Sequence, residues 1–382
     1  MLRPGMNIAI LGTRGIPANY GGFETCAEQL SERWAAWGHN VMLYARKDRY
    51  EKRPTTVNGV SVRYTSSFSL FGLETPSAAF LATLNLIFRG RQFRWIHLYN
   101  TGNAFLLPLL RALGFRVVVS VDGIEWRRKK WGWVQRSAHK LGAYFAARLA
   151  DRVVVDNDAV ADFYAKRFRC ATATIAYGAK PIMRSDDAHE ILSRFGLKPD
   201  GYCIFIGRIV PEKGVRELID AYEQLETDLA LVIVGDDPRT AYRDEIWARQ
   251  SDRVRLVGYQ YGRVCDQLLS NARMYVSASM LEGTSPSLLS AMSAGVCCLV
   301  NGIPENRSTA GGSVALYEQN NAADLVRIWQ ALLDDPERRA SLAASGQAHQ
   351  RQFYDWDVIA RRYIELFDEV ERARSQAPQA AT

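Results

Sequence analysis

The stretch Asn7-Ile-Ala-Ile-Leu11-Gly12 decides the fold class, because a short apolar strand here runs directly into a glycine. A helical pattern follows. Between Phe23 and Trp37 apolar side chains recur at the spacing of one helix face, and Gly38 is placed to end the helix. A strand, a loop and an amphipathic helix in succession are typical of α/β domains built on parallel sheets.

The same unit recurs along the chain. Helix-length segments separate further expected strands in the first half, at residues 41–45, 95–99, 116–121, 153–156 and 174–177. The pattern lapses between residues 179 and 200, and a second series of strands then begins, at residues 202–206, 229–234, 254–257, 274–277 and 296–300. A chain of 382 residues is also longer than one hydrophobic core usually supports.

These observations predict an α/β protein with two tandem Rossmann-like domains. We expect an N-terminal domain over residues 1–180 and a C-terminal domain over residues 181–355. A last helix and a loose tail are expected over residues 356–382, with the helix packing back on the N-terminal domain. Ligands of open α/β sheets bind beyond the carboxyl ends of the strands, so both sheets are expected to face a central cleft.

Charge is unevenly distributed along the sequence. Residues 1–180 hold 26 Lys and Arg against 12 Asp and Glu, a net charge of +14, whereas the remainder has a net charge of −7. A basic half can serve nucleic acid, an anionic bilayer or a phosphorylated substrate. No nucleic-acid recognition motif accompanies the charge, so we expect no nucleic-acid partner.

The sequence shows no secretory signal and no apolar run long enough to span a bilayer, so a cytoplasmic protein is expected. The six cysteines form no C-x-x-C pair, which favours reduced thiols over a zinc site or a disulfide framework.

The first candidate site follows the strand at residues 202–206. The sequence Gly207-Arg208-Ile-Val-Pro-Glu-Lys213-Gly214 places two cations between a strand and the next helix. Cations near a helix N-terminus can bind a diphosphate. The alternative is a solvated basic turn without a ligand.

The second candidate site is the sequence Glu282-Gly283-Thr284-Ser285-Pro286, which precedes an apolar helical pattern. Ser285 is a favourable N-cap and Pro286 a favourable first helical residue, so the free helix amides would face back toward Glu282 and Gly283. A carboxylate here can accept hydrogen bonds from sugar hydroxyls. The alternative is that Glu282 only stabilises the helix N-terminus.

Together these two motifs resemble the donor domain of the retaining glycosyltransferases of family four, which have the two-Rossmann GT-B fold. The resemblance implies that Arg208 and Lys213 hold the diphosphate, that Glu282 contacts the transferred sugar, and that Val257-Gly258-Tyr259 borders the base. It also implies catalysis without metal or cofactor, in which cations and helix amides stabilise the negative charge of the leaving group. The family has a second Glu, which binds ribose, where this chain has Ser290.

In the first domain, a loop with Gly12, Gly15, Gly21 and Gly22 leads to Glu24 at the start of a helix. Gly15, Gly21, Gly22 and Glu24 are candidate substrate contacts, and Gly21 and Gly22 let a ligand approach the backbone closely. The loop lacks the G-x-G-x-x-G spacing that a nicotinamide-dependent oxidoreductase would have. The loop resembles a bacterial subgroup that includes rhamnosyltransferases of cell-wall and capsule polysaccharide assembly.

A second string of this subgroup is Val121-Asp122-Gly123-Ile-Glu125-Trp126-Arg127. Asp122 stands where related enzymes carry a His near the reacting centre, so it is a candidate to orient the acceptor hydroxyl, and Glu125 a candidate substrate contact. The alternative is that Asp122 caps a turn with Gly123.

Cations alternate with tryptophans at residues 127–133, and further cations stand on either side, at Arg89, Arg91, Arg94, Arg136 and Lys140. Cations reach lipid phosphates while indoles favour the headgroup level, so a face for an anionic membrane is expected, with a solvated charge run as the alternative.

The sequence therefore predicts a metal-independent retaining glycosyltransferase, peripheral on the inner face of the plasma membrane, that extends a lipid-diphosphate-linked saccharide. The resemblance favours rhamnose from its thymidine diphosphate as donor. The alternatives are hexosyl transfer from a uridine or guanosine nucleotide and, in another class, a non-catalytic partner of a polysaccharide assembly complex.

Overall fold

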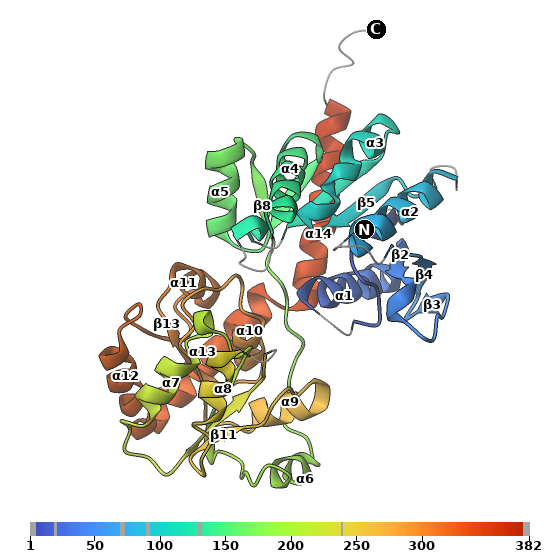
Figure 1. Cartoon of the computed structure of the whole chain (residues 1–382). Helices are drawn as coiled ribbons and strands as arrows, with labels where there is room; N and C mark the ends of the chain where they lie inside the picture. Colours follow the sequence, from blue (N-terminus) through green and yellow to red (C-terminus); the bar gives the residue numbers. More distant parts are fainter. Residues whose placement is uncertain are drawn as a thin grey trace. The chain divides into compact units, whose positions relative to one another are not determined.

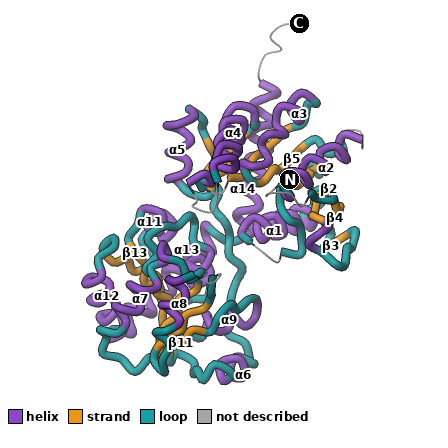
Figure 2. Tube along the Cα trace, viewed as in Figure 1, coloured by secondary structure: helices purple, strands orange, loops and turns teal. Residues whose placement is uncertain are grey.

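The protein is described by a computed structural model covering residues 5–18, 21–68, 73–88, 92–121, 123–127, 132–237 and 240–376. The chain divides into two compact units (Figure 1). Unit 1 comprises Met1–Tyr177 together with Trp356–Thr382, and unit 2 comprises Gly178–Asp355. In each unit, strands alternate with helices along the chain (Figure 2).

Unit 1 is built on a sheet with the strand order β3-β4-β2-β1-β5-β6-β7-β8. All neighbouring strands are parallel except β3 and β4. The strands are β1 (Asn7–Leu11), β2 (Asn40–Arg46), β3 (Thr56–Val57), β4 (Val60–Thr65), β5 (Trp95–Tyr99), β6 (Arg116–Val121), β7 (Arg152–Val155) and β8 (Thr172–Thr174).

Helices cover both faces of this sheet. One face packs on α1 (Gly22–Ala36) and α14 (Trp356–Gln376). The other packs on α2 (Glu74–Phe88), α3 (Leu107–Ala112), α4 (Trp133–Leu149) and α5 (Asp158–Phe168). Side chains alternate between the two cores along β1, where Ile8 and Ile10 face the first and Ala9 and Leu11 the second.

Helix α14 comes from the far end of the chain and is part of the core of unit 1. The indole of Trp34 on α1 donates a hydrogen bond of 3.1 Å to the carbonyl of Ala360. The same indole packs edge-on against Tyr363 and Phe367. Unit 1 is therefore closed by two segments that are distant in sequence.

Unit 2 has an all-parallel sheet with the order β11-β10-β9-β12-β13-β14. Its strands are β9 (Tyr202–Ile206), β10 (Ala230–Val234), β11 (Val254–Leu256), β12 (Met274–Ser277), β13 (Cys297–Asn301) and β14 (Ala315–Tyr317). Its helices are α6 (Ala188–Ser193), α7 (Val215–Tyr222), α8 (Ala241–Trp247), α9 (Gly262–Ser270), α10 (Pro286–Ser293), α11 (Pro304–Ala310), α12 (Ala322–Asp334) and α13 (Pro336–Phe353).

The predicted fold class is confirmed, with differences at the sheet edges. The strand expected at residues 174–177 is instead β8, because Thr174 pairs with Val155, the last residue of β7, and the ladder ends there. The edge strands β3 and β14 were not predicted, and neither was β4, which lies between β3 and β2. The two edge strands have two and three residues, too few for a clear pattern. Within the described part of the chain, no helix is both long and apolar enough to cross a bilayer.

Candidate functional site

Four segments of unit 2 meet where β9, β10, β11 and β12 end. The amide of Gly235 donates to the carbonyl of Gly258 at 2.8 Å, and the amide of Met280 donates to the carbonyl of Glu212 at 2.9 Å. A Cβ on Gly235, whose φ is +132°, would lie 1.9 Å from the carbonyl oxygen of Gly207. The loops after these strands are therefore tied into one edge, where open α/β sheets bind ligands.

Lys213 and Glu282 form an ion pair at this edge. Lys213 ends the 3-10 turn η4 (Pro211–Lys213), and Glu282 lies between β12 and α10. The distance from Nζ of Lys213 to Oε1 of Glu282 is 2.6 Å. The two side chains are only 19% and 8% exposed. The structure thus brings together two predicted site residues that are far apart in sequence.

Arg208 follows β9 and leaves most of its side chain in solvent, with 60% exposed. Its Nη1 lies 4.0 Å from Oδ1 of Asp237. Burial raises the pKa of Asp237, while the charge of Arg208 acts in the opposite direction. An anionic ligand can therefore reach the Arg208 guanidinium without first displacing a tight ion pair.

The segment after β10 carries residues that the sequence analysis missed. Asp236 accepts hydrogen bonds from Nε of Arg243 at 2.9 Å and from Nε1 of Trp247 at 3.1 Å. The bond from Arg243 is the main cause that lowers the pKa of Asp236. These contacts fix the backbone that carries Asp237 beside Arg208. The signal available in sequence was the Gly-Asp-Asp string that follows a buried strand.

Helix α10 begins as predicted. Pro286 is its first residue, and the hydroxyl of Ser285 accepts from the amide of Leu288 at 3.5 Å. The N-cap of α10 is therefore Ser285, and the carboxylate of Glu282 is bound to Lys213. The side-chain contact of Glu282 is thus with Lys213, and the side-chain cap of the helix is supplied by Ser285.

The remaining predicted residues of unit 2 lie around the same edge. Gly283 and Thr284 connect Glu282 to the N-cap, and Thr284 is buried. Ser290 is half-buried in the second turn of α10. The exposed ring of Tyr259 stacks on Tyr261, with centroids 5.9 Å apart and planes 14° from parallel. This stacked pair offers a flat aromatic surface next to the segment that carries Gly258.

In unit 1, two predicted ligand contacts support their own loop. The buried carboxylate of Glu24 accepts a hydrogen bond of 3.0 Å from the backbone amide of Arg14. Gly15 has a φ of +121°, and a Cβ there would lie 2.4 Å from the Cβ of Ala45 on β2. Sequence reasoning assigned both residues to substrate, and the structure gives each a role in holding the loop after β1.

Gly21 and Gly22 stand at the N-terminus of α1, where Gly21 is the N-cap residue and Gly22 the first helical residue. Glu125 is buried in the short turn η3 (Glu125–Arg127). Asp122 lies outside the described residues, as do Arg89, Arg91, Arg128, Lys129, Lys130 and Trp131 of the expected membrane-facing cluster.

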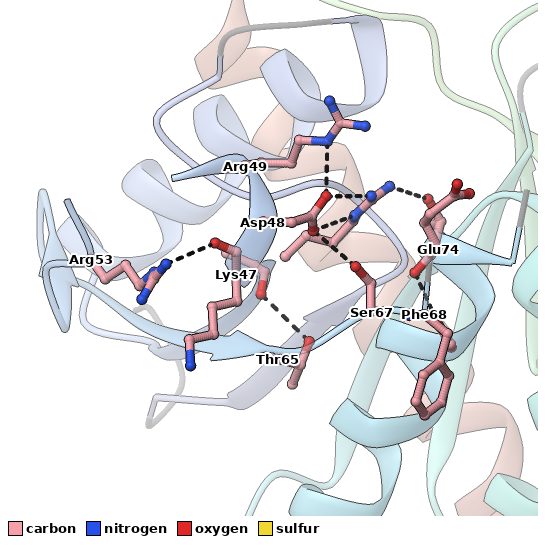
Figure 3. A network of polar contacts seen from close by, with 12 residues as sticks. Lys47, Asp48, Arg49, Arg53, Thr65, Ser67, Phe68 and Glu74 are labelled. Carbon is pink, nitrogen blue, oxygen red and sulfur yellow. Dashed lines mark hydrogen bonds and ion pairs between the residues drawn. The ribbon is translucent and has the colours of Figure 1, made fainter. Parts of the chain in front are cut away.

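A polar network lies where β2 and β4 end (Figure 3). Asp48 accepts from Nε and Nη2 of the buried Arg46 at 3.1 and 2.7 Å and from the hydroxyl of Ser67 at 3.0 Å. Arg49 adds an ion pair of 3.3 Å. The bonds from Arg46 are the main cause that lowers the pKa of Asp48 to about 2. Hydrogen bonds and ion pairs to Asp48 therefore hold together the segments that follow β2 and β4.

Two family models match the chain. The model described as a glycosyl transferase 4-like domain matches residues 21–177, and the model described as glycosyl transferases group 1 matches residues 190–349. One match falls in each unit.

Characterised relatives agree with these matches. The chain is 24% identical to the phosphatidylinositol N-acetylglucosaminyltransferase GPI3 subunit of Saccharomyces cerevisiae (strain YJM789), over 97% of this chain and 84% of that protein. It is 30% identical to the O-antigen chain mannosyltransferase B of Escherichia coli, over 52% and 54%. It is 29% identical to the N,N'-diacetylbacillosaminyl-diphospho-undecaprenol alpha-1,3-N-acetylgalactosaminyltransferase of Campylobacter jejuni, over 44% of each chain.

The fold has counterparts among solved structures. Sucrose-phosphate synthase from Thermosynechococcus elongatus matches with a TM-score of 0.78 and 20% identity, over 96% of this chain and 100% of that chain. Together with the two Rossmann-like sheets and the family matches, this likeness identifies the architecture. The chain therefore combines a glycosyl transferase 4-like domain in unit 1 with a glycosyl transferases group 1 domain in unit 2, on the two-sheet architecture of the GT-B glycosyltransferases.

Proposed function

We propose that this glycosyltransferase moves a sugar, with retention of configuration, from a nucleotide diphosphate to a lipid-diphosphate-linked saccharide at the inner face of the plasma membrane. The proposal includes no metal and no cofactor beyond the donor itself. The observation that carries it is the Lys213–Glu282 pair beside the exposed Arg208 at the carboxyl edge of unit 2. This edge offers two cations for a diphosphate and one carboxylate for sugar hydroxyls.

In this proposal the cations act on the leaving group. Negative charge grows on the diphosphate as the bond from the sugar C1 to the phosphate oxygen breaks. Arg208 and Lys213 stabilise that charge, and the N-terminus of α10 adds its partial positive charge. Glu282 orients Lys213 and accepts hydrogen bonds from the sugar, while the Tyr259 ring borders the base.

The acceptor is assigned to unit 1. Its hydroxyl oxygen forms the new bond to C1 on the face that the leaving group vacates, and its proton passes to the departing phosphate oxygen. Asp122 orients the hydroxyl. Gly21 and Gly22 let the acceptor approach the backbone at the start of α1.

The first donor to test is thymidine diphosphate rhamnose. Ser290 replaces the family Glu that binds ribose, and the deoxyribose of a thymidine nucleotide offers one hydroxyl fewer for such a carboxylate. A second candidate, hexosyl transfer from a uridine or guanosine nucleotide, is favoured by the relatives, whose names specify mannosyl, N-acetylglucosaminyl and N-acetylgalactosaminyl transfer.

Thermal shift with a panel of nucleotide sugars and with NAD tests donor binding, since a ligand at 100 times its dissociation constant adds about 2.7 kcal/mol of stability. Turnover is then measured with the donors that bind and a polyprenyl-diphosphate-linked saccharide. Arg208→Ala should abolish the shift while Arg216→Ala, which removes an arginine paired with Glu245 on α8, should retain it.

Two results would contradict the proposal. Binding without turnover of any donor would favour the non-catalytic partner, and a shift with NAD alone would favour an oxidoreductase.

A further inference from the structure

Exposed large apolar side chains gather on one side of unit 1. They lie on α2, on the turn η2 (Thr101–Leu106), on α3 and on α4. We call them the outer apolar face, and its members are Phe80, Phe88, Phe105, Leu109, Trp133, Val134, Leu141 and Tyr144. Among the described residues, the helices α1 and α14 on the opposite side of the sheet expose no large apolar side chain. The exposure is therefore specific to one layer of helices.

Helix α4 has two distinct apolar sides. Its buried side carries His139, Gly142, Ala143 and Ala146, which contact the core. On the opposite side, the helical spacing brings the exposed residues of α4 together, and Trp133 is 80% exposed. A helix that only shields a core would be polar on that opposite side.

Helix α2 repeats this pattern, since Phe80, Leu84 and Phe88 follow one another at intervals of four residues. Phe88 is 86% exposed. The helices also adjoin: α4 approaches η2 so closely that a Cβ on Gly142 would lie 1.9 Å from the carbonyl oxygen of Thr101. The exposed apolar side chains therefore stand on elements that pack into one layer, and a group of such side chains is typical of an interaction site.

Charge decides which partner this surface fits. Residues 74–149, from the start of α2 to the end of α4, contain twelve Lys and Arg but only three acidic residues, Glu74, Asp122 and Glu125. On α4 itself the charged residues are Arg136, Lys140 and Arg148, all cationic. A second copy placed on the same surface would bring like charges together, whereas an anionic lipid surface accepts both the cations and the apolar side chains.

We propose that the outer apolar face enters the boundary between headgroups and acyl chains of an anionic bilayer, and that its apolar side chains determine the affinity. The inference rests on the proposed function, because a lipid-linked acceptor reaches the protein from that bilayer. Cations around the outer apolar face contact lipid phosphates. Arg148 can do so, because its guanidinium carbon lies 5.8 Å from the centroid of the exposed Tyr144 ring.

The test is sedimentation of the full chain with vesicles of phosphatidylcholine containing phosphatidylglycerol. The Trp133→Ser/Leu141→Ser double variant should lower the partition coefficient at least tenfold, because two exposed apolar side chains are lost without disturbing the core. Met183→Ser is the matched control, since this side chain is 78% exposed but lies in unit 2. The control should bind as wild type.

A second measurement locates the side chain in the bilayer. Lipids brominated on their acyl chains should quench tryptophan fluorescence of the wild type, and Trp133→Phe should show measurably less quenching while still binding vesicles. Arg136→Gln/Lys140→Gln should weaken binding and reduce its salt dependence.

The inference would be overturned by unchanged vesicle binding of the Trp133→Ser/Leu141→Ser variant, or by a wild-type dimer in ultracentrifugation that this variant dissociates. Failure of the proposed function gives a different result. In that case no nucleotide sugar is turned over with a soluble acceptor analogue, although the vesicles still bind. If the proposed function and the membrane inference both hold, the Trp133→Ser/Leu141→Ser variant should turn over the soluble acceptor analogue at the wild-type rate.

Discussion

Replacing Lys213 by Met should cost unit 2 more stability than the loss of an ordinary surface ion pair. The variant leaves the Glu282 carboxylate, 8% exposed, without the ammonium that lies 2.6 Å from it. Removing one partner of a fully buried pair costs about 3–5 kcal/mol. Because Lys213 is 19% exposed, water can reach part of the site, and we expect a loss of roughly 2–3 kcal/mol in the free energy of unfolding.

A double-mutant cycle separates the interaction energy of the Lys213–Glu282 pair from the destabilisation that either substitution causes by itself. Glu282→Gln removes the buried negative charge, so the Lys213→Met/Glu282→Gln variant should recover at least half of the loss of Lys213→Met, about 1 kcal/mol or more. The matched control is Arg216→Met, which breaks the solvent-exposed pair with Glu245 and should cost under about 1 kcal/mol.

The assay is urea unfolding together with hydrogen exchange of peptides from β12 and α10, which flank Glu282. Equal costs for Lys213→Met and Arg216→Met would refute the reasoning, and so would a double variant that is no more stable than Lys213→Met alone. Transfer by Lys213→Ala should fall about 100-fold or more, because a cation is lost from the diphosphate, and it is measured below the temperature at which the variant unfolds.

Three further predictions concern separate parts of the molecule. Arg208→Ala should fold normally, since the side chain is 60% exposed, and should lower kcat/KM about 100-fold or more; activity within threefold of wild type would contradict its role. Ser290→Glu should improve binding of uridine diphosphate relative to thymidine diphosphate by about 1–2 kcal/mol in calorimetry, and a wild-type preference for the uridine or guanosine nucleotide would exclude the thymidine donor. Burial lowers the pKa of His97 to about 3, so the stability that its neutral form contributes is present above the unfolded value near 6.5 and is lost as pH falls toward 3. Between pH 7 and pH 5, hydrogen exchange of β5 should therefore show the wild type losing about 2 kcal/mol more than His97→Gln, and equal losses would contradict this.

The sequence alone predicted those features that depend on a few neighbouring residues. Strands such as β1, β5 and β6 were predicted with their observed ends, because an apolar run bounded by Gly or by polar residues is a local signal. The start of α10 was also correct, since Ser285 and Pro286 act within a single helical turn. Arg208, Lys213 and Glu282 were proposed as site residues from motifs of the same short range.

Only the tertiary structure decided which of these residues touch. Lys213 and Glu282 are 69 positions apart, and nothing in either motif states that one neutralises the other. The partner of Glu24 could not be predicted from sequence either, because a carboxylate at a helix start can bind a ligand or a loop amide. Its hydrogen bond from the amide of Arg14 depends on how the loop folds back. For the outer apolar face, exposure of the side chains could not be predicted from sequence. Apolar residues lie on several sides of α2, and whether Phe88 is covered or exposed depends on which side the sheet buries.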